Sequence, residues 1–525
     1  MICVSLGRTR HKMMIAEHRA LAERGAELVE LRVDWIPRNL RLDRLIKDRP
    51  TEVILTCRRP QDGGRFDGSE EKRLQILREG IVAGVEYVDL EVDIAKKVPR
   101  YGKTKRIVSF HDFEKTPDDL EEIHKQLCEC DADIVKIVTM ADSPADNVRM
   151  MKLVESAKVP TVGFCMGEQG LVSRVLCGKY GAPFTYATFN KERVMAPGQL
   201  SFDEMKKLYR YDSIDKDTKV YAVLGDPIAH SWSPLLHNLA FIKTKLNSVY
   251  VPLRVSAEDF DELVKEYEFF GIEGYSVTIP HKHSALEFAT QVEEAAEEIG
   301  AANTLIRQSN GEWFARNTDY DAALESIHLG LEMKSENSLN GQRVLILGAG
   351  GVARAIGLGA VRQGAVVTIT NRSKGRAVKL AEDLNCQSVT WENRGSVGVD
   401  VVVNCTPVGM FPDMNESPYH GHWLREGVVV FDTIYNPENT LLLKQAKTRL
   451  CHTVSGIEMF VRQAAAQFKA FTGIEAPLDQ MRTSLRRSIS PVRVKTEQGH
   501  AAPSEQSAKT STKSPQKPAD NNEQS

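Results

Sequence analysis

The feature that most constrains the fold of this chain is a regular alternation of short apolar runs and helix-like segments over about residues 1–210. Eight runs have the length and β-branched content of buried strands, and segments such as 70–83 and 117–130 have helical length and charge. The runs are ICVSL, LVELRVD, EVILTCR, YVDLEV, RIVSFHDF, DIVKIVT, TVGFCM and FTYATF. Eight β–α units in one block predict a (β/α)8 barrel, on the small side for that fold. A doubly wound sheet is the alternative, although it usually has fewer strands.

The remaining sequence contains a linker, a second α/β block and a polar tail. RYDSIDKDTK at 210–219 lacks apolar periodicity and predicts a short interdomain linker. The second block runs from 219 to about Pro477. Residues 482–525 are rich in Ser, Pro, Lys, Gln and Glu and nearly free of large apolar side chains. Such a segment cannot offset its ordering entropy by burial, so we expect it to be disordered.

Length, charge and cysteine usage narrow the class of protein. A chain of 525 residues is too long for a single core, so two or three domains are expected. A formal net charge of −3 gives no sign of a nucleic-acid-binding face. Nine cysteines without disulfide or zinc spacing favour reduced thiols and no metal site. The N-terminal residues lack signal-peptide features, and no apolar run approaches the ~20 residues that span a bilayer. We therefore expect a cytoplasmic protein without a membrane or nucleic-acid partner.

A lysine interrupts the sixth apolar run, DIVKIVT at 133–139. Burying an ammonium group is costly unless the group is paired or loses its proton. The active sites of barrels lie where the strands end at the C-terminal face. Other polar residues fall at comparable strand positions, namely Glu30, Arg32, Arg58, Glu91 and His111.

We interpret Lys136 as a nucleophile that points into the barrel. A lysine between apolar walls and arginines is expected to give up its proton, and a neutral amine can form a Schiff base with a ketone. His111 on the neighbouring strand can move protons at the adjacent carbon. The arginines predict an anionic substrate, a carboxylate. In the alternative reading, Lys136 points outward and extends between the helices. The polar companions at matching positions favour the inward orientation.

Motifs across residues 1–210 resemble those of type I 3-dehydroquinate dehydratase. They are VSL at 4–6, ELRVD at 30–34, TCR at 56–58, SFHDF at 109–113, DIVKIVT at 133–139, MGEQGLVSR at 166–174 and APGQ at 196–199. The resemblance implies that Lys136 forms an imine with the C3 ketone of 3-dehydroquinate. It also implies that His111 removes the C2 proton and helps the C1 hydroxyl to leave, and that Arg174 binds the substrate carboxylate. Residues that would hold hydroxyls and pack the ring are Ser5, Glu30, Arg32, Arg58, Met166 and Gln199.

Two positions depart from the pattern of this family. Met195 stands before APGQ, where the family usually has a serine, and it cannot donate a hydrogen bond. Asp62 stands before the paired glycines in place of the commoner glutamate. Both lie in loops expected to close over substrate, so turnover or affinity is expected to change while the covalent chemistry remains.

A glycine-rich turn in the second block predicts a dinucleotide site. G-x-G-x-x-A follows a strand and opens a helix, which is the required context for binding a pyrophosphate. For the glycines alone, a purely structural turn is the alternative. After the next strand, an NAD site would carry an acidic residue, but this chain carries two arginines, which favour NADP(H). The predicted cofactor residues are Gly348, Ala349, Gly350, Gly351, Asn371, Arg372, Ser373 and Arg376.

Lys282 and Asp319 form the second candidate catalytic pair. Each follows a predicted strand, and together they could exchange a proton with a carbonyl while hydride comes from the cofactor. The alternative is a surface salt bridge of little energetic value.

Motifs between about 219 and 477 resemble shikimate dehydrogenase. They include GDPIAHSWSP, SVTIPHK, AANTL, NTDY, GAGGVARA, NCTPVGM, DTIYNP and GIEMFVRQAAAQF. The resemblance implies a substrate domain at 219–320, a Rossmann NADP domain at 321–457 and a helix at 458–477 that returns to the substrate domain. It also implies that Lys282 and Asp319 are the catalytic pair. The implied ligand contacts are Ser231 and Ser233 for the carboxylate, Thr278, Asn303, Tyr435 and Gln463 for ring hydroxyls, and Gly456 for the cofactor.

The two resemblances together imply consecutive steps of one pathway. The barrel is expected to convert 3-dehydroquinate to 3-dehydroshikimate, and the second half to reduce that product to shikimate with NADPH. One alternative is an aldolase-like barrel fused to an NAD-dependent quinate or shikimate dehydrogenase, against which Arg372 and Arg376 argue. The other is a metabolite-sensing regulator without activity, which should have lost Lys136, His111, Lys282 and Asp319.

Overall fold

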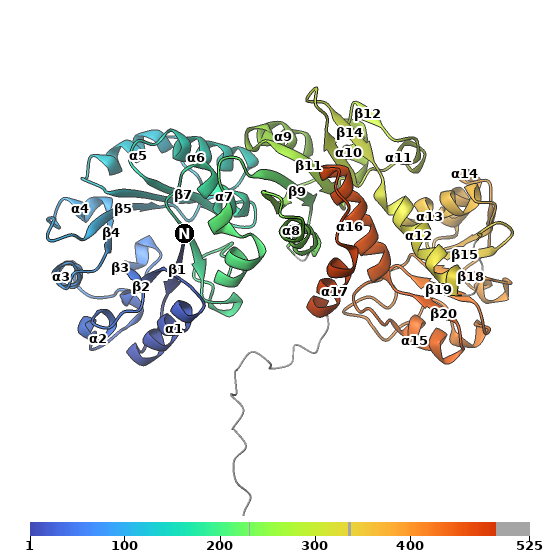
Figure 1. Cartoon of the computed structure of the whole chain (residues 1–525), viewed down its shortest axis with the longest axis horizontal. Coiled ribbons are helices and arrows are strands. Elements are labelled where there is room, and N and C mark those ends of the chain that lie inside the picture. Colours follow the sequence, from blue (N-terminus) through green and yellow to red (C-terminus); the bar gives the residue numbers. More distant parts are fainter. Residues whose placement is uncertain (230, 334–337, 490–525) are drawn as a thin grey trace, which may run out of the picture. The chain divides into compact units, whose positions relative to one another are not determined.

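The computed structural model describes residues 1–229, 231–333 and 338–489. Three sheets organise these residues, made of strands β1–β8, β9–β14 and β15–β20 (Figure 1). Each sheet is described below with the helices that cover it.

The first sheet is a nearly closed barrel of eight parallel strands, ordered β7-β6-β5-β4-β3-β2-β1-β8. Its strands are β1 Ile2–Leu6, β2 Leu28–Arg32, β3 Glu52–Thr56, β4 Tyr87–Glu91, β5 Lys105–His111, β6 Ile134–Met140, β7 Thr161–Met166 and β8 Thr185–Thr188. β1 pairs in parallel with both β2 and β8, so the first and the last strand of the barrel lie side by side. Each of the eight apolar runs overlaps one strand, so the predicted barrel is confirmed.

Helices alternate with these strands on the outside of the barrel (Figure 1). They are α1 His11–Glu23, α2 Leu42–Ile46, α3 Glu70–Val82, α4 Val92–Ala95, α5 Leu120–Cys128, α6 Pro144–Ser156 and α7 Leu171–Leu176. Local sequence sets their starts: Ser69 caps α3 by accepting from the amide of Lys72, and Asp146 of α6 accepts from the amide of Ser143.

The predicted linker at 210–219 is packed against the barrel rather than free. The ring of Tyr211 is buried, and its hydroxyl lies 3.3 Å from the sulfur of Cys177. Lys179 donates to the carbonyls of Lys216 and Thr218 at 2.7 and 2.8 Å. Residues 1–489 accordingly form one compact unit.

The second sheet has the order β10-β9-β11-β13-β14-β12. Its strands are β9 Lys219–Gly225, β10 Ser248–Arg254, β11 Ile272–Val277, β12 Gln291–Val292, β13 Thr304–Arg307 and β14 Trp313–Arg316. β10, β9 and β11 run parallel, and β13 returns antiparallel to both β11 and β14. Its helices are α8 Ser233–Thr244, α9 Phe260–Glu266, α10 Lys282–Phe288 and α11 Glu294–Ile299.

The third sheet is parallel, with the order β17-β16-β15-β18-β19-β20. Counted from β15 as the first strand, this order is 3-2-1-4-5-6, the arrangement of a Rossmann fold, which confirms the prediction. Its strands are β15 Arg343–Leu347, β16 Val366–Thr370, β17 Gln387–Ser388, β18 Val401–Asn404, β19 Val429–Asp432 and β20 His452–Val454. Its helices are α12 Thr318–Met333, α13 Gly351–Arg362, α14 Lys374–Asp383 and α15 Leu441–Thr448. The expected boundary at 320/321 falls inside α12.

Two further helices, α16 Gly456–Thr472 and α17 Leu478–Ile489, end the described chain. Met481 and Leu485 of α17 are fully buried in a core cluster that also contains Leu236 of α8 and Phe468 of α16. The prediction of disorder from residue 482 is therefore wrong for 482–489. Met481 stands just before the predicted boundary and Leu485 four residues later on the same helix face, and the polar composition of 482–525 conceals Leu485. Residues 490–525 lie outside the described part of the chain.

Candidate active sites

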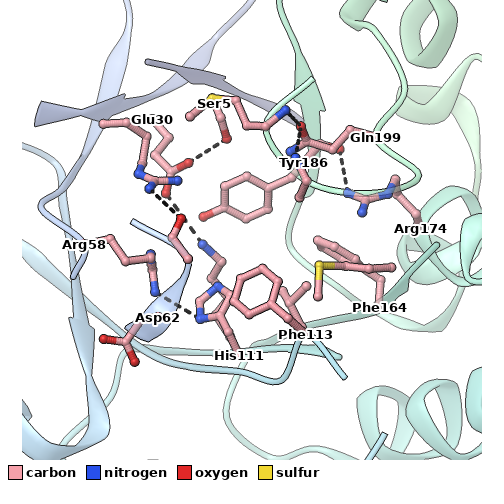
Figure 2. Close-up of a pocket in the computed structure, with 17 residues that line it drawn as sticks. Ser5, Glu30, Arg58, Asp62, His111, Phe113, Phe164, Arg174, Tyr186 and Gln199 are labelled. Carbon is pink, nitrogen blue, oxygen red and sulfur yellow. Dashed lines mark hydrogen bonds and ion pairs between the residues drawn. The ribbon is translucent and has the colours of Figure 1, made fainter. Parts of the chain in front are cut away.

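A pocket opens at the C-terminal ends of the barrel strands (Figure 2). Nine residues predicted from the sequence line it: Ser5, Glu30, Arg32, Arg58, His111, Lys136, Met166, Arg174 and Gln199. Glu91, the other polar residue singled out, is not part of the lining and pairs with Arg73 at 2.7 Å. The wall is completed by Asp62, Gly63, Phe113, Val138, Phe164, Tyr186, Met195 and Ala196. Phe164 and Tyr186 are lining residues that the sequence analysis did not single out, because an aromatic side chain within an apolar run gives no sign of a site.

Lys136 is buried in the barrel with 4% exposure, as the inward reading predicts. Its Nζ lies 3.0 Å from Oδ2 of Asp89 and 3.6 Å from Oε1 of Glu30. The nearest charged groups are thus carboxylates, rather than the arginines expected from the sequence. They hold the amine in place, and the lysine must be neutral at the moment it attacks a carbonyl.

Arg32 and Arg58 already have carboxylate partners inside the protein. Arg32 donates to both oxygens of Asp34 at 2.9 and 2.8 Å. Arg58 lies 2.8 Å from Asp89 and donates to Nδ1 of His111 at 3.0 Å. The two arginines are therefore held by carboxylates of the protein itself. A substrate carboxylate, which the sequence led us to expect at these arginines, needs another partner.

His111 is held neutral by its surroundings. Burial, followed by the charges of Arg58 and Lys136, lowers the pKa of His111 well below its ordinary value. Because a guanidinium can only donate, Nδ1 accepts in the contact with Arg58 and the ring proton lies on Nε2. Asp62, which also lines the pocket, pairs with Arg59 at 2.6 Å.

Arg174 is the guanidinium in this pocket that lacks a carboxylate among the described residues. It is 1% exposed, stacks 4.2 Å from the ring centre of Phe164 and donates to the carbonyl of Tyr186 at 3.4 Å. Burial lowers the pKa of Arg174 to about 10. A buried and unpaired guanidinium suits a ligand that brings its own carboxylate.

Gln199 organises the loop that covers the pocket. Its Oε1 accepts from the backbone amides of Met195 and Ala196 at 2.8 and 3.2 Å. This arrangement leaves the amide nitrogen of the side chain available as a donor toward the pocket.

A second pocket of about 380 Å³ lies in the dehydrogenase-like half. It contains the predicted residues Ser231, Ser233, Thr278, Lys282, Asn303, Asp319, Tyr435, Gly456 and Gln463. Further lining residues, which the sequence did not single out, include Ser276, Val352, Thr433, Met459, Phe460 and Gln467.

Lys282 and Asp319 meet across this pocket. The Nζ of Lys282 donates to Oδ2 of Asp319 at 2.6 Å, and both side chains are partly buried. Asn303 supports the start of α12, since it donates to Thr318 at 3.0 Å and accepts from the amide of that residue at 2.9 Å. The pair is therefore an ordered element of the pocket, not an exposed salt bridge.

The geometry of the glycine turn fits a dinucleotide. Gly348 has φ +122° and approaches the chain just after β18 so closely that a Cβ would lie 3.0 Å from the carbonyl oxygen of Cys405. A Cβ on Gly350 or Gly351 would meet no atom within 4 Å, so the start of α13 is open to a pyrophosphate. The turn lies between β15 and β18, where the strand order of the sheet reverses and ligands of such folds bind.

The residues beyond β16 suit a phosphate group. Arg372 and Arg376 are exposed, and neither forms an ion pair with a described carboxylate. Asn371 donates to the carbonyl of Ser373 at 3.2 Å and shapes the turn that carries them. This donor set fits a 2′-phosphate.

The described residues contain no group of three or more His, Cys, Asp or Glu side chains able to hold a metal ion. None of the helices in this part of the chain combines the length and the apolar character needed to span a membrane.

Comparison with protein families gives matches along most of the chain. Residues 2–216 match the model of type I 3-dehydroquinase, and 223–305 match the substrate binding domain of shikimate dehydrogenase. Residues 343–433 match a model described as NADP oxidoreductase, coenzyme F420-dependent. Residues 456–486 match the C-terminal domain of shikimate 5′-dehydrogenase.

Individual relatives agree with these matches. The chain is 37% identical over 500 residues to the chloroplastic bifunctional 3-dehydroquinate dehydratase/shikimate dehydrogenase of Arabidopsis thaliana, covering 91% of this chain and 83% of that protein. It is 36% identical to the shikimate dehydrogenase (NADP(+)) of Shouchella clausii, covering 49% and 94% of the two chains. A shikimate 5-dehydrogenase from Thermus thermophilus, solved with NADP(H) and shikimate, is 32% identical with a TM-score of 0.47, covering 52% and 100%. The chain therefore belongs to the family of bifunctional 3-dehydroquinate dehydratase/shikimate dehydrogenases.

Proposed function

We propose that this chain catalyses two consecutive reactions. The barrel removes water from 3-dehydroquinate to give 3-dehydroshikimate, and the second half reduces that ketone to shikimate with NADPH. The observation that carries the proposal is the buried Lys136 beside Asp89, Glu30 and His111 in a pocket that also holds the unpaired Arg174. The names of the relatives, including an NADP(+)-dependent shikimate dehydrogenase, support the same pair of reactions.

In the barrel, Lys136 attacks the C3 ketone and forms an imine, while Arg174 binds the carboxylate. The positively charged imine acidifies the neighbouring C2 proton. His111, neutral because its pKa is lowered by burial, removes this proton and returns it to the departing C1 hydroxyl. The lone pair of the neutral ring, on Nδ1, accepts from Arg58, so this contact must break before His111 can take up a proton. Ser5, Glu30, Arg32, Arg58, Met166 and Gln199 surround the ring.

In the second pocket, Ser231 and Ser233 at the start of α8 bind the carboxylate of 3-dehydroshikimate. Thr278, Asn303, Tyr435 and Gln463 hold ring hydroxyls. Lys282, paired with Asp319, places a proton on the ketone oxygen, and the bound NADPH supplies the hydride. The cofactor residues are Gly348, Ala349, Gly350, Gly351, Asn371, Arg372, Ser373, Arg376 and Gly456.

A cytoplasmic location remains part of this proposal. All nine cysteines are free thiols, which supports a reducing compartment. Fractionation of the native cells would check it.

One spectrophotometric trace tests the two-step reaction. The protein is mixed with 3-dehydroquinate and NADPH, and the nicotinamide absorbance is followed. Its decrease requires both sites in sequence. A flat trace with 3-dehydroquinate and again with 3-dehydroshikimate would contradict the proposal.

Two reciprocal variants separate the sites. Lys136→Ala should lower dehydration more than about 10³-fold and leave the reduction of added 3-dehydroshikimate unchanged. Lys282→Ala should do the reverse, so that 3-dehydroshikimate accumulates from 3-dehydroquinate without NADPH oxidation. Loss of both activities in a folded Lys136→Ala protein would contradict two separate sites.

A further inference from the structure

Tyr186 of β8 has a buried hydroxyl that the roles above leave unexplained. The residue is 3% exposed and lines the barrel pocket. Its hydroxyl oxygen makes no hydrogen bond with any residue in the described part of the chain. Buried polar atoms without a partner are rare because each one costs folding free energy. A ligand that supplies the missing partner would explain this one.

The ring of Tyr186 lies directly beside the amine of Lys136. The Nζ of Lys136 is 4.1 Å from the ring centre, and Figure 2 shows the hydroxyl pointing toward the Glu30 side of the pocket. Burial, followed by the charge of Glu30, raises the pKa of Tyr186 well above its usual value, so the hydroxyl keeps its proton. The floor of the pocket therefore presents a permanent donor next to the nucleophile.

The other hydroxyls near Lys136 already donate to carboxylates. Ser5 donates to Glu30 at 2.6 Å, Thr56 to Glu30 at 2.8 Å and Ser109 to Asp89 at 2.6 Å. Tyr186 is thus the hydroxyl among these four that has a proton free for a ligand. The pocket has a volume of about 60 Å³, which exceeds the roughly 10–15 Å³ that one water molecule requires.

We propose that Tyr186 is a catalytic residue whose hydroxyl donates a hydrogen bond to the oxygen on C3. It does so while that oxygen is expelled as water during imine formation, and again when water returns to hydrolyse the product imine. This inference rests on the imine chemistry proposed for Lys136.

The step balances without an outside reagent. The bond between C3 and Nζ forms, the bond between C3 and oxygen breaks, and the electron pair of that bond leaves with the oxygen. Two of the three ammonium protons of Lys136 end on the oxygen as water, and the third stays on the imine nitrogen. The O–H bond of Tyr186 remains intact and stabilises the negative charge that develops on the oxygen as the carbonyl opens.

The test compares wild type with Tyr186→Phe in a single turnover. Full-length protein is mixed with a smaller amount of 3-dehydroquinate, quenched with borohydride at intervals, and the reduced adduct on Lys136 is measured by mass spectrometry. We expect the adduct to appear and to disappear at least about tenfold more slowly in the variant. The melting temperature should be equal or higher, because phenylalanine keeps the ring and removes the unpaired hydroxyl.

Tyr87→Phe is the matched control. Tyr87 is a buried tyrosine of β4 outside the pocket lining, so its variant should keep wild-type adduct rates. Wild-type adduct rates in Tyr186→Phe would overturn the inference alone. Slower adduct rates together with a lower melting temperature in Tyr186→Phe would also overturn it, since disturbed packing of the pocket would then explain the slower rates. If wild type itself forms no adduct, the proposed imine chemistry fails and the inference fails with it.

Discussion

At the scale of single residues, the barrel site depends on a carboxylate that the sequence did not single out. Asp89 is buried between Arg58 at 2.8 Å and Lys136 at 3.0 Å. Burial alone would raise the pKa of Asp89, but the charges of Arg58 and Lys136 outweigh it and lower the pKa far below its usual range. Asp89 therefore stays ionised and compensates two buried cations.

Replacing this carboxylate should destabilise the protein. Asp89→Asn keeps the shape but leaves Lys136 and Arg58 short of one negative charge, so we expect a loss of about 3–5 kcal/mol in the free energy of unfolding. Urea denaturation measures it. The control is Asp93→Asn, since the pair of half-exposed Asp93 with Arg59 should contribute less than about 1 kcal/mol. Equal losses in both variants would contradict this role of Asp89.

A pH profile tests the neutral state of His111. The pKa of His111 is lowered mainly by burial, so kcat/KM for dehydration should show no decrease at the ordinary histidine pKa of about 6.5. The unfolded chain binds the histidine proton near that pH while the folded chain does not. The contribution of His111 to stability is therefore complete above about pH 6.5 and is lost progressively as the pH falls. The prediction would be contradicted if kcat/KM for dehydration fell to half near pH 6.5 while kcat/KM for reduction did not.

At the scale of elements, α17 is a structural part of the dehydrogenase half. Arg482 donates to both carboxylate oxygens of Glu458 on α16 at 2.9 to 3.1 Å, and Leu485 is fully buried beside α8. The helix thereby supports α16, whose residues Gly456 and Gln463 line the second pocket.

Truncating the buried side of α17 should weaken this half. Leu485→Ala is expected to cost about 2–5 kcal/mol of unfolding free energy because it removes a fully packed side chain. Thermal inactivation of the reductase measures the effect. The neighbouring exposed Arg487 offers a control, and Arg487→Ala should change stability by less than about 0.5 kcal/mol. Equal inactivation temperatures for both variants would show that α17 is dispensable.

At the scale of the whole molecule, side chains of the barrel and of the dehydrogenase half pack together. The hydroxyl of Tyr267 accepts from Asn147 of α6 at 3.1 Å, and the rings of Tyr180 and Phe269 stack at 5.1 Å. Phe270, 1% exposed, contacts both Tyr180 and Tyr267. The two catalytic halves therefore share a core while each keeps its own pocket.

A shared core predicts that one substitution affects both activities. Phe270→Ala should remove about 3–5 kcal/mol of packing and lower the inactivation temperature of dehydration as well as of reduction. Phe471→Ala is the matched control, because Phe471 contacts Tyr221 and His237 within the dehydrogenase half. That variant should affect reduction more than dehydration. An unchanged dehydratase in Phe270→Ala would show that the halves unfold independently.

The sequence by itself determined the elements and the chemistry that the chain can carry. The eight apolar runs follow from local periodicity, so the barrel was predictable. The glycine turn indicated a dinucleotide site, and the resemblance to shikimate dehydrogenase implied the Rossmann domain. Lys136 stood out because a charged side chain inside an apolar strand is costly unless it is paired or loses its proton. Lys282 and Asp319 stood out because they follow predicted strands in the block that carries the dinucleotide turn. The prediction for 482–489 was wrong, because the average composition of 482–525 conceals Leu485, which packs together with Met481 just before that segment.

Only the tertiary structure decided which charges meet. Asp89 pairs with Lys136 across 47 positions of sequence, and Arg58 contacts His111. It also decided that the linker is packed and that the hydroxyl of Tyr186 lacks a partner among the described residues. The physical reason is the same in each case. Coulomb energy, burial and hydrogen bonding depend on distances in space. The periodicity of the sequence shows only which side of its own helix or strand a residue occupies.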